Sequence, residues 1–305
     1  MFLQHLKYCF TGAMRFDHAQ LETLRVIVEE GTFDAAARRL HLTPSAVSQR
    51  VRALEAAAGQ VLVRRTTPVG VTDAGEPVLR LARQLRLLDD EAAAELDSDG
   101  VVELAVVVNA DSLATWFRPV LAAVAERGGT ALRLHIEDQA YSDELLRRGE
   151  VLAAVTAEPQ PVQGCVVEPL GSLRYRPAAA PDLIERYRRG KGVDRARMPV
   201  VVFNEKDHLQ DAAIRANPPV IVHRIPSAAD YYEAIRCGLG WGMLPEGQLK
   251  SGVAAGEVAP LPGSRHLDVP LFWQRWRLEG TALTALTEDV RRAARAGLGR
   301  ATART

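Results

Sequence analysis

A segment near the amino end combines two faces at helical spacing, and one of them carries side chains suited to contacting DNA bases. From Leu40 to Thr66 the sequence reads LHLTPSAVSQRVRALEAAAGQVLVRRT. Apolar residues at i, i+4 and i+7 indicate a stripe that packs on a core: Val47, Val51 and Leu54. Another face carries polar side chains of modest length: Ser45, Ser48, Gln49 and Arg52. Glutamine can bond adenine bidentately, arginine can bond guanine or phosphate, and serine can serve either.

The neighbouring segments predict a helix-turn-helix that positions this face. A first helix is expected over Asp17 to Glu30, and Thr32 caps a second helix over Phe33 to Leu40. After a tight turn, Thr43 caps a third helix, with Pro44 at its first position, where the missing N–H does no harm. In such a pair the second helix enters the DNA major groove.

A basic wing is expected after Gly59, where QVLVRRTTPVGVT predicts two strands with Val61 and Val63 pointing inward. The chain has no net charge, but the segment 38–65 holds six arginines and a single acid, Glu55. Charge alone is equally consistent with a solvated face. The caps, the turn and the wing together favour DNA binding, with these candidate contacts: Thr43, Pro44, Ser45, Ser48, Gln49, Arg52, Arg64 and Arg65.

A long helix is expected from Thr72 or Asp73 to Leu96, with one apolar seam. The seam steps by threes and fours, close to a coiled-coil pattern: Val78, Leu81, Leu85, Leu88 and Ala92. We expect it to pair with a second copy, because a homodimer also suits a two-fold DNA site. The alternative is that the seam packs against its own wing domain.

Beyond Gly100 strands alternate with helices, which predicts an α/β domain of two lobes joined by two crossings and separated by a ligand cleft. The expected organisation is a disordered extension at 1–14, an all-α winged helix-turn-helix at 15–71, a linker (dimerisation) helix at 72–98 and a periplasmic-binding-protein-like domain at 101–305. Lobe I is expected at about 101–176 and 264–305, and lobe II at about 177–263.

Composition and motifs exclude several other classes of protein. The chain has 305 residues, 47% of them hydrophobic and 25% charged, and lacks both an apolar run of membrane-spanning length and a signal-peptide core. Three cysteines and unclustered histidines favour free thiols in the cytoplasm and no metal site. GLGWG lacks dinucleotide spacing, and no hydrolase or zinc-protease motif occurs, so we expect neither an enzyme nor a cofactor.

The order of these domains resembles that of the LysR-type transcriptional regulators. The resemblance rests on FDAAARRLHLTPSAVSQRVRALEAAAGQVLVRR, TDAGEPVLRLARQ and GLGWGMLPE. VNADSLATWF, IEDQ and LRRGEVLAAVT resemble the ArgP/LysG branch, which senses lysine or arginine and controls a basic amino-acid exporter. The resemblance implies binding to double-stranded promoter DNA as a homodimer or homotetramer, with RNA polymerase as a partner. A nucleoid or replication-initiation protein with weak sequence preference is the alternative function.

The resemblance also places an effector site in the cleft. By family position it comprises Asn109, Asp111, Ser112, Glu137, Asp138, Thr156, Asn204 and Asp207. Amides at a helix start, with the Ser112 hydroxyl, suit an α-carboxylate, and the carboxylates suit an ammonium and a side-chain cation. For Asn109, Asp111 and Asp207, simple helix capping is the alternative role.

Overall fold

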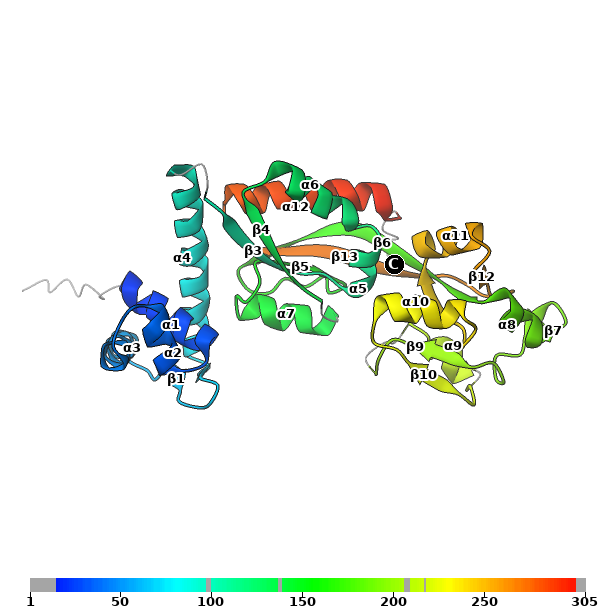
Figure 1. Cartoon of the computed structure of the whole chain (residues 1–305), viewed down its shortest axis with the longest axis horizontal. Helices are drawn as coiled ribbons and strands as arrows, with labels where there is room; N and C mark the ends of the chain where they lie inside the picture. Colours follow the sequence, from blue (N-terminus) through cyan, green and yellow to red (C-terminus); the bar gives the residue numbers. More distant parts are fainter. Residues whose placement is uncertain (1–14, 97–99, 137–138, 206–208, 217, 300–305) are drawn as a thin grey trace, which may run out of the picture. The chain divides into compact units, whose positions relative to one another are not determined.

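The computed structural model describes residues 15–96, 100–136, 139–205, 209–216 and 218–299 (Figure 1). The chain divides into two compact units. The amino-terminal unit comprises residues 1–92 together with 148–150, and the carboxyl-terminal unit comprises the remainder. The predicted extension at 1–14 lies outside the described residues, and the predicted hinge at 97–100 lies outside them except for Gly100.

The amino-terminal unit is a winged helix-turn-helix whose second and third helices begin directly after the predicted caps, Thr32 and Thr43, and whose first helix is capped by Asp17, which was predicted to lie within that helix. Side-chain oxygens of Asp17, Thr32 and Thr43 each accept a backbone N–H bond, at 3.1, 3.1 and 3.2 Å. Gly31 ends the first helix with φ of 71°, a conformation that favours glycine. The elements are α1 (His18–Glu30), α2 (Phe33–Arg39), α3 (Pro44–Ala58), β1 (Val63–Arg64), β2 (Gly70–Val71) and α4 (Gly75–Leu96).

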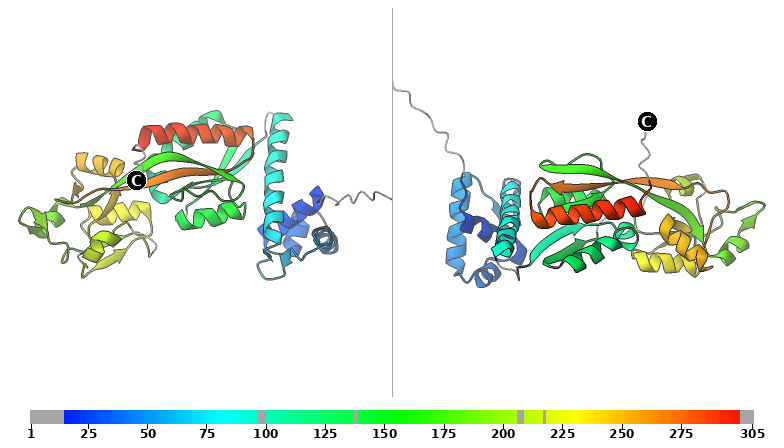
Figure 2. Two further views of the ribbon diagram at one scale, coloured as in Figure 1. Left: turned by 180° about the vertical axis from the view of Figure 1, so that it is seen from behind. Right: turned by 90° about the horizontal axis from the view of Figure 1, so that it is seen from above.

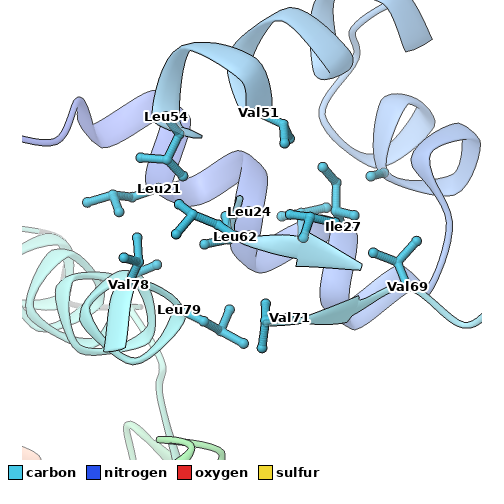
Figure 3. Close-up of a cluster of buried hydrophobic side chains, with 14 of the residues drawn as sticks. Leu21, Leu24, Ile27, Val51, Leu54, Leu62, Val69, Val71, Val78 and Leu79 are labelled. Atoms are coloured by element: carbon cyan, nitrogen blue, oxygen red, sulfur yellow. The ribbon is translucent and has the colours of Figure 1, made fainter. Parts of the chain in front are cut away.

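One hydrophobic core joins the three helices, the wing and the start of α4 (Figure 3). The predicted stripe of α3 is buried, with Val47, Val51 and Leu54 at most 1% exposed. The prediction for Val61 is wrong, because this side chain is 65% exposed and Leu62 is buried instead. The strand begins only at residue 63, and the Glu55 carboxylate accepts the amides of residues 62 and 63 at 2.9 and 3.3 Å, which holds Leu62 inward.

The seam of α4 divides between two environments. Val78 is buried in the core of the amino-terminal unit, and Leu81 and Leu85 pack against that core. For this half of the helix, packing on its own wing domain is therefore the correct interpretation. Leu88 is 39% exposed and Ala92 is exposed, so the second half of the seam remains open.

The carboxyl-terminal unit is built on a seven-stranded mixed sheet with the order β11-β6-β13-β5-β3-β4, and β12 pairs with β6. Helices α6 and α12 lie on one face of its first lobe and α7 on the other (Figures 1 and 2). The strands are β3 (Val102–Val107), β4 (Thr130–His135), β5 (Ala153–Thr156), β6 (Cys165–Ala179), β11 (Gly242–Pro245), β12 (Ala259–Pro260) and β13 (Leu267–Trp276). The helices are α6 (Arg118–Arg127), α7 (Gln139–Arg147) and α12 (Thr281–Gly297).

The long antiparallel strands β6 and β13 extend from the first lobe into the second, which confirms the two expected crossings. A two-stranded parallel sheet, β9 with β10, completes the second lobe. Its further elements are α8 (Pro181–Arg186), β7 (Arg188–Arg189), β8 (Gly192–Val193), β9 (Val200–Val202), α9 (Asp211–Ala216), β10 (Val222–Arg224), α10 (Ala228–Arg236) and α11 (Glu246–Ala254). The sequence did not predict α8, α11, β12 or the β7–β8 pair.

The segment after β3 forms two short helices instead of a single continuous one. The chain forms α5 (Ala110–Ala114), breaks at Thr115 and resumes as α6. Pro119 stands in the first turn of α6, where its missing N–H costs nothing, whereas a continuous helix would lose a hydrogen bond there. Within the described part of the chain, no helix is both long and apolar enough to cross a membrane.

Candidate DNA interface and ligand cleft

The predicted recognition face of α3 is accessible to solvent. Ser45, Gln49 and Arg52 are exposed and Ser48 is half-buried, whereas the apolar stripe of the same helix is buried. Thr43 is exposed, but its hydroxyl caps α3 and lies 2.9 Å from the Ser45 hydroxyl. Thr43 therefore positions the start of the helix, and the other side chains remain available for base edges.

Both wing arginines have partners that the sequence analysis missed. An Arg64 Nη lies 3.2 Å from an Asp73 carboxylate oxygen, and both side chains are more than half exposed. The Arg65 guanidinium lies 5.2 Å from the centre of the Phe33 ring. An exposed ion pair contributes about 0–1 kcal/mol, so a DNA phosphate can replace Asp73 as the partner of Arg64.

In the first lobe the predicted cleft residues gather at the carboxyl ends of two adjacent strands. Asn109 follows β3 and Thr156 ends β5, and these strands are parallel neighbours. Ser112 is fully buried on α5, and its hydroxyl has no hydrogen-bond partner among the described residues. The same holds for Asn109 Oδ1, which forms no capping bond although Asn109 precedes α5. The capping alternative for Asn109 is therefore wrong, and this end of the sheet holds two buried polar atoms without a hydrogen-bond partner among the described residues.

Other predicted cleft residues have structural partners or lie elsewhere. Asp111 accepts a hydrogen bond of 2.7 Å from the Tyr175 hydroxyl on β6. The Thr156 hydroxyl accepts the backbone N–H of Glu158 at 3.0 Å, so it shapes the turn after β5. Asn204 follows β9 in the second lobe and is half-buried. Glu137, Asp138 and Asp207 lie outside the described residues.

The sequence analysis did not predict a pair of neighbouring acidic side chains in the first lobe, Asp143 and Glu158. Burial, and next the charge of Glu158, raise the pKa of Asp143 on α7, and its Oδ1 has no hydrogen-bond partner among the described residues. Glu158 lies in the turn after β5, where its backbone N–H donates to the Thr156 hydroxyl. Asp143 is partly buried beside the exposed carboxylate of Glu158, and this concentration of negative charge favours a cationic guest. Only the packing of α7 on β5 brings them together, so sequence spacing gave no signal.

We expect Asp143→Asn to raise stability at pH 7. A raised carboxyl pKa means that the folded protein disfavours the charged form, so the wild type regains stability as the pH falls through that pKa. The advantage of the variant, about 1 kcal/mol or less because solvent screens a half-buried group, should shrink toward pH 4. Urea unfolding at both pH values measures this difference. Asp182→Asn, at an exposed site, is the control, and a loss of stability at pH 7 for Asp143→Asn contradicts the assignment.

Comparison with known proteins gives matches over most of the chain. Residues 18–76 match the model of the bacterial regulatory helix-turn-helix proteins of the lysR family, and residues 98–295 match the LysR substrate binding domain. The chain is 47% identical over 284 residues to the lysine export transcriptional regulatory protein LysG of Corynebacterium efficiens, covering 91% of this chain and 98% of the relative. It is 38% identical over 294 residues to the transcriptional regulator ArgP of Pseudomonas aeruginosa, covering 93% and 97%.

The matches to two solved structures extend over the full length of those structures' chains. Full-length LysG from Corynebacterium glutamicum with bound effector arginine has a TM-score of 0.80 and 46% identity, and matches 93% of this chain. ArgP from Mycobacterium tuberculosis has a TM-score of 0.85 and 43% identity, and matches 94%. The winged helix-turn-helix and the two-lobed α/β domain are thus both shared with these proteins.

Proposed function

Since the chain belongs to the LysR family of bacterial transcriptional regulators, we propose that it senses a basic amino acid, lysine or arginine, and controls the gene of an amino-acid exporter. It is a DNA-binding regulator and not an enzyme. The LysG relatives are named for lysine export, and one of them holds arginine as its effector. These relatives also favour regulation over a nucleoid or replication-initiation role.

The DNA contacts are proposed to come from the exposed face of α3 and from the wing. The observation that carries this assignment is the polar face opposite a fully buried stripe on one helix. Ser45, Ser48, Gln49 and Arg52 would read base edges, while Arg64 and Arg65 would bind phosphates. Thr43 and Pro44 set the start of the helix.

We propose that side-chain atoms without hydrogen-bond partners bind the effector. The backbone amides at the start of α5 are weaker candidates, because this helix is little more than one turn long. The Ser112 hydroxyl can donate to an α-carboxylate, and Asn109 Oδ1 can accept from an α-ammonium. Asp143 and Glu158 offer charge for a side-chain cation, which is costly to bury unpaired. Asp111, Thr156 and Asn204 remain proposed cleft residues, as do Glu137, Asp138 and Asp207.

Calorimetry with lysine and arginine tests the effector assignment, with norleucine and citrulline as neutral analogues of similar length. We expect heat from the cationic amino acids and affinity weaker by about tenfold or more for the analogues, since a charged hydrogen bond contributes about 1.5–3 kcal/mol. Ser112→Ala should weaken binding, whereas Ser251→Ala, at an exposed position on α11, should not. If neither lysine nor arginine gave heat, the effector assignment would be wrong, and the proposal that the protein binds DNA would be unaffected.

The remaining assignments concern assembly and partners. We propose a cytoplasmic homodimer or homotetramer in which the exposed half of the α4 seam, including Leu88, meets a second copy. RNA polymerase is the proposed partner at the promoter. The proposed domains are 15–71, 72–98 and 101–305, and the lobe limits are those predicted from the sequence.

A further inference from the structure

We propose that the second lobe holds a separate binding site for a small organic anion, in a pocket on the sheet face opposite α10. The pocket has a volume of about 550 Å³. Pro177, Met243 and Leu267 form an apolar part of its lining, and Arg195, Arg215 and Arg265 bring cationic side chains to it.

The strand register places this pocket away from the α10 face of the sheet. Met243 on β11 pairs with Pro177 on β6. Their neighbours Leu244 and Ala178 are buried in the cluster that contains Ile235 of α10. Because successive side chains on a strand point to opposite faces, Met243 and Pro177 point away from α10. None of the residues proposed for the effector cleft lines the pocket, so we treat the pocket as a second site.

The pocket carries a cation without a carboxylate partner. The Arg195 guanidinium lies 5.9 Å from the centre of the Trp241 ring, and among the described residues it forms no ion pair. Burial lowers the pKa of Arg195, which reports the cost of removing its charge from water. A bound anion would offset this cost by supplying charge-assisted hydrogen bonds.

The other charged groups of the lining leave a positive excess. Arg215 lies 3.4 Å from Asp211, the one acid among the lining residues. His266 is 3.7 Å from Asp268, which is already held by two hydrogen bonds from Arg174. Arg265 is exposed at the rim. An excess of positive charge disfavours lysine and arginine themselves and favours carboxylates or phosphates.

The apolar lining and the volume select an organic anion rather than a bare ion. A carboxylate or phosphate group would bind Arg195, and the carbon skeleton would lie on Pro177 and Met243. Pro177 and Leu267 belong to β6 and β13, the two strands that join the lobes. An occupant would therefore contact the connection between the lobes directly, and this inference does not depend on the identity of the cleft effector.

Calorimetry on the full-length protein at constant ionic strength tests the site, with citrate, inorganic phosphate and neutral glycerol as probes. We expect citrate to bind at millimolar or lower concentration and glycerol not to bind, and Arg195→Gln to weaken citrate binding about tenfold or more. Arg189→Gln is the matched control, because this arginine lies in the same lobe, is 80% exposed and pairs with Asp194. Because the apolar lining favours a carbon skeleton, we expect inorganic phosphate to bind more weakly than citrate.

Two results would overturn the proposal. One is no binding of either anion by the wild-type protein, and the other is an equal loss of binding in Arg189→Gln and Arg195→Gln. Circular dichroism checks that the variants fold. If Arg195→Gln does not fold, the same measurement is made with Arg215→Gln, which removes another arginine of the lining. Heat from arginine measured on the same samples separates this site from the cleft, since Arg195→Gln should leave that heat unchanged.

Discussion

Gly75→Ala is expected to destabilise the amino-terminal unit by about 1–3 kcal/mol and to weaken operator binding with it. A Cβ at residue 75 would lie 2.1 Å from the Leu62 carbonyl oxygen and 2.9 Å from the Val71 Cβ. Neither can withdraw easily, because Thr72 donates to the Leu62 oxygen and Val71 belongs to β2. The added methyl group must therefore push α4 away from the wing and open the core that both share.

Scanning calorimetry of the full-length variant measures this effect, and a DNA-binding titration at fixed salt follows its consequence. Gly70→Ala is the matched control, since it also lies in the wing region and its Cβ would meet nothing within 4 Å. We expect Gly70→Ala to leave the unfolding temperature nearly unchanged. Equal shifts in both variants would mean that contact with Leu62 is not the cause.

Gln49→Ala is expected to lower operator affinity about ten- to a hundredfold while leaving affinity for random DNA nearly unchanged. Its side chain is exposed on α3, and a bidentate contact to a base contributes about 1–3 kcal/mol of discrimination. Arg64→Ala should instead weaken binding to all sequences and reduce the salt slope by about one, because a phosphate contact carries no sequence information.

Competition binding at several stated salt concentrations distinguishes these outcomes. The promoter upstream of the neighbouring gene and a scrambled duplex of equal length serve as the two DNAs. If both substitutions lowered affinity uniformly, Gln49 would not be a base contact. A wild-type specificity ratio near one would favour the nucleoid or replication-initiation role.

Features set by a few neighbouring residues were predictable from the sequence. The caps Thr32 and Thr43 and the end of the first helix at Glu30 depend on local hydrogen bonds and backbone angles, and all three are confirmed. The buried face of α3 follows from spacing alone, and Val47 and Leu54 are both 0% exposed. The alternation of strands and helices beyond Gly100 predicted the two-lobed fold, and the long strands β6 and β13 confirm it.

Features set by distant contacts were not predictable. Whether Val61 or Leu62 points inward depends on where the Glu55 carboxylate binds the backbone, and alternation alone gave the wrong answer. The seam of α4 looked uniform, but the wing core covers only its first half. Asp143 and Glu158 meet only through the packing of α7 on β5, so a list of acids by family position omitted them.

The position of Glu55 has an electrostatic consequence for the whole segment 38–65. Its carboxylate is the sole negative side chain among six arginines, and it accepts two main-chain amides of the wing. Because this carboxylate binds backbone amides, and forms no ion pair with the six arginines among the described residues, it does not occupy a guanidinium group that could bind phosphate. One residue thus fastens the wing to α3 without taking an arginine away from a duplex.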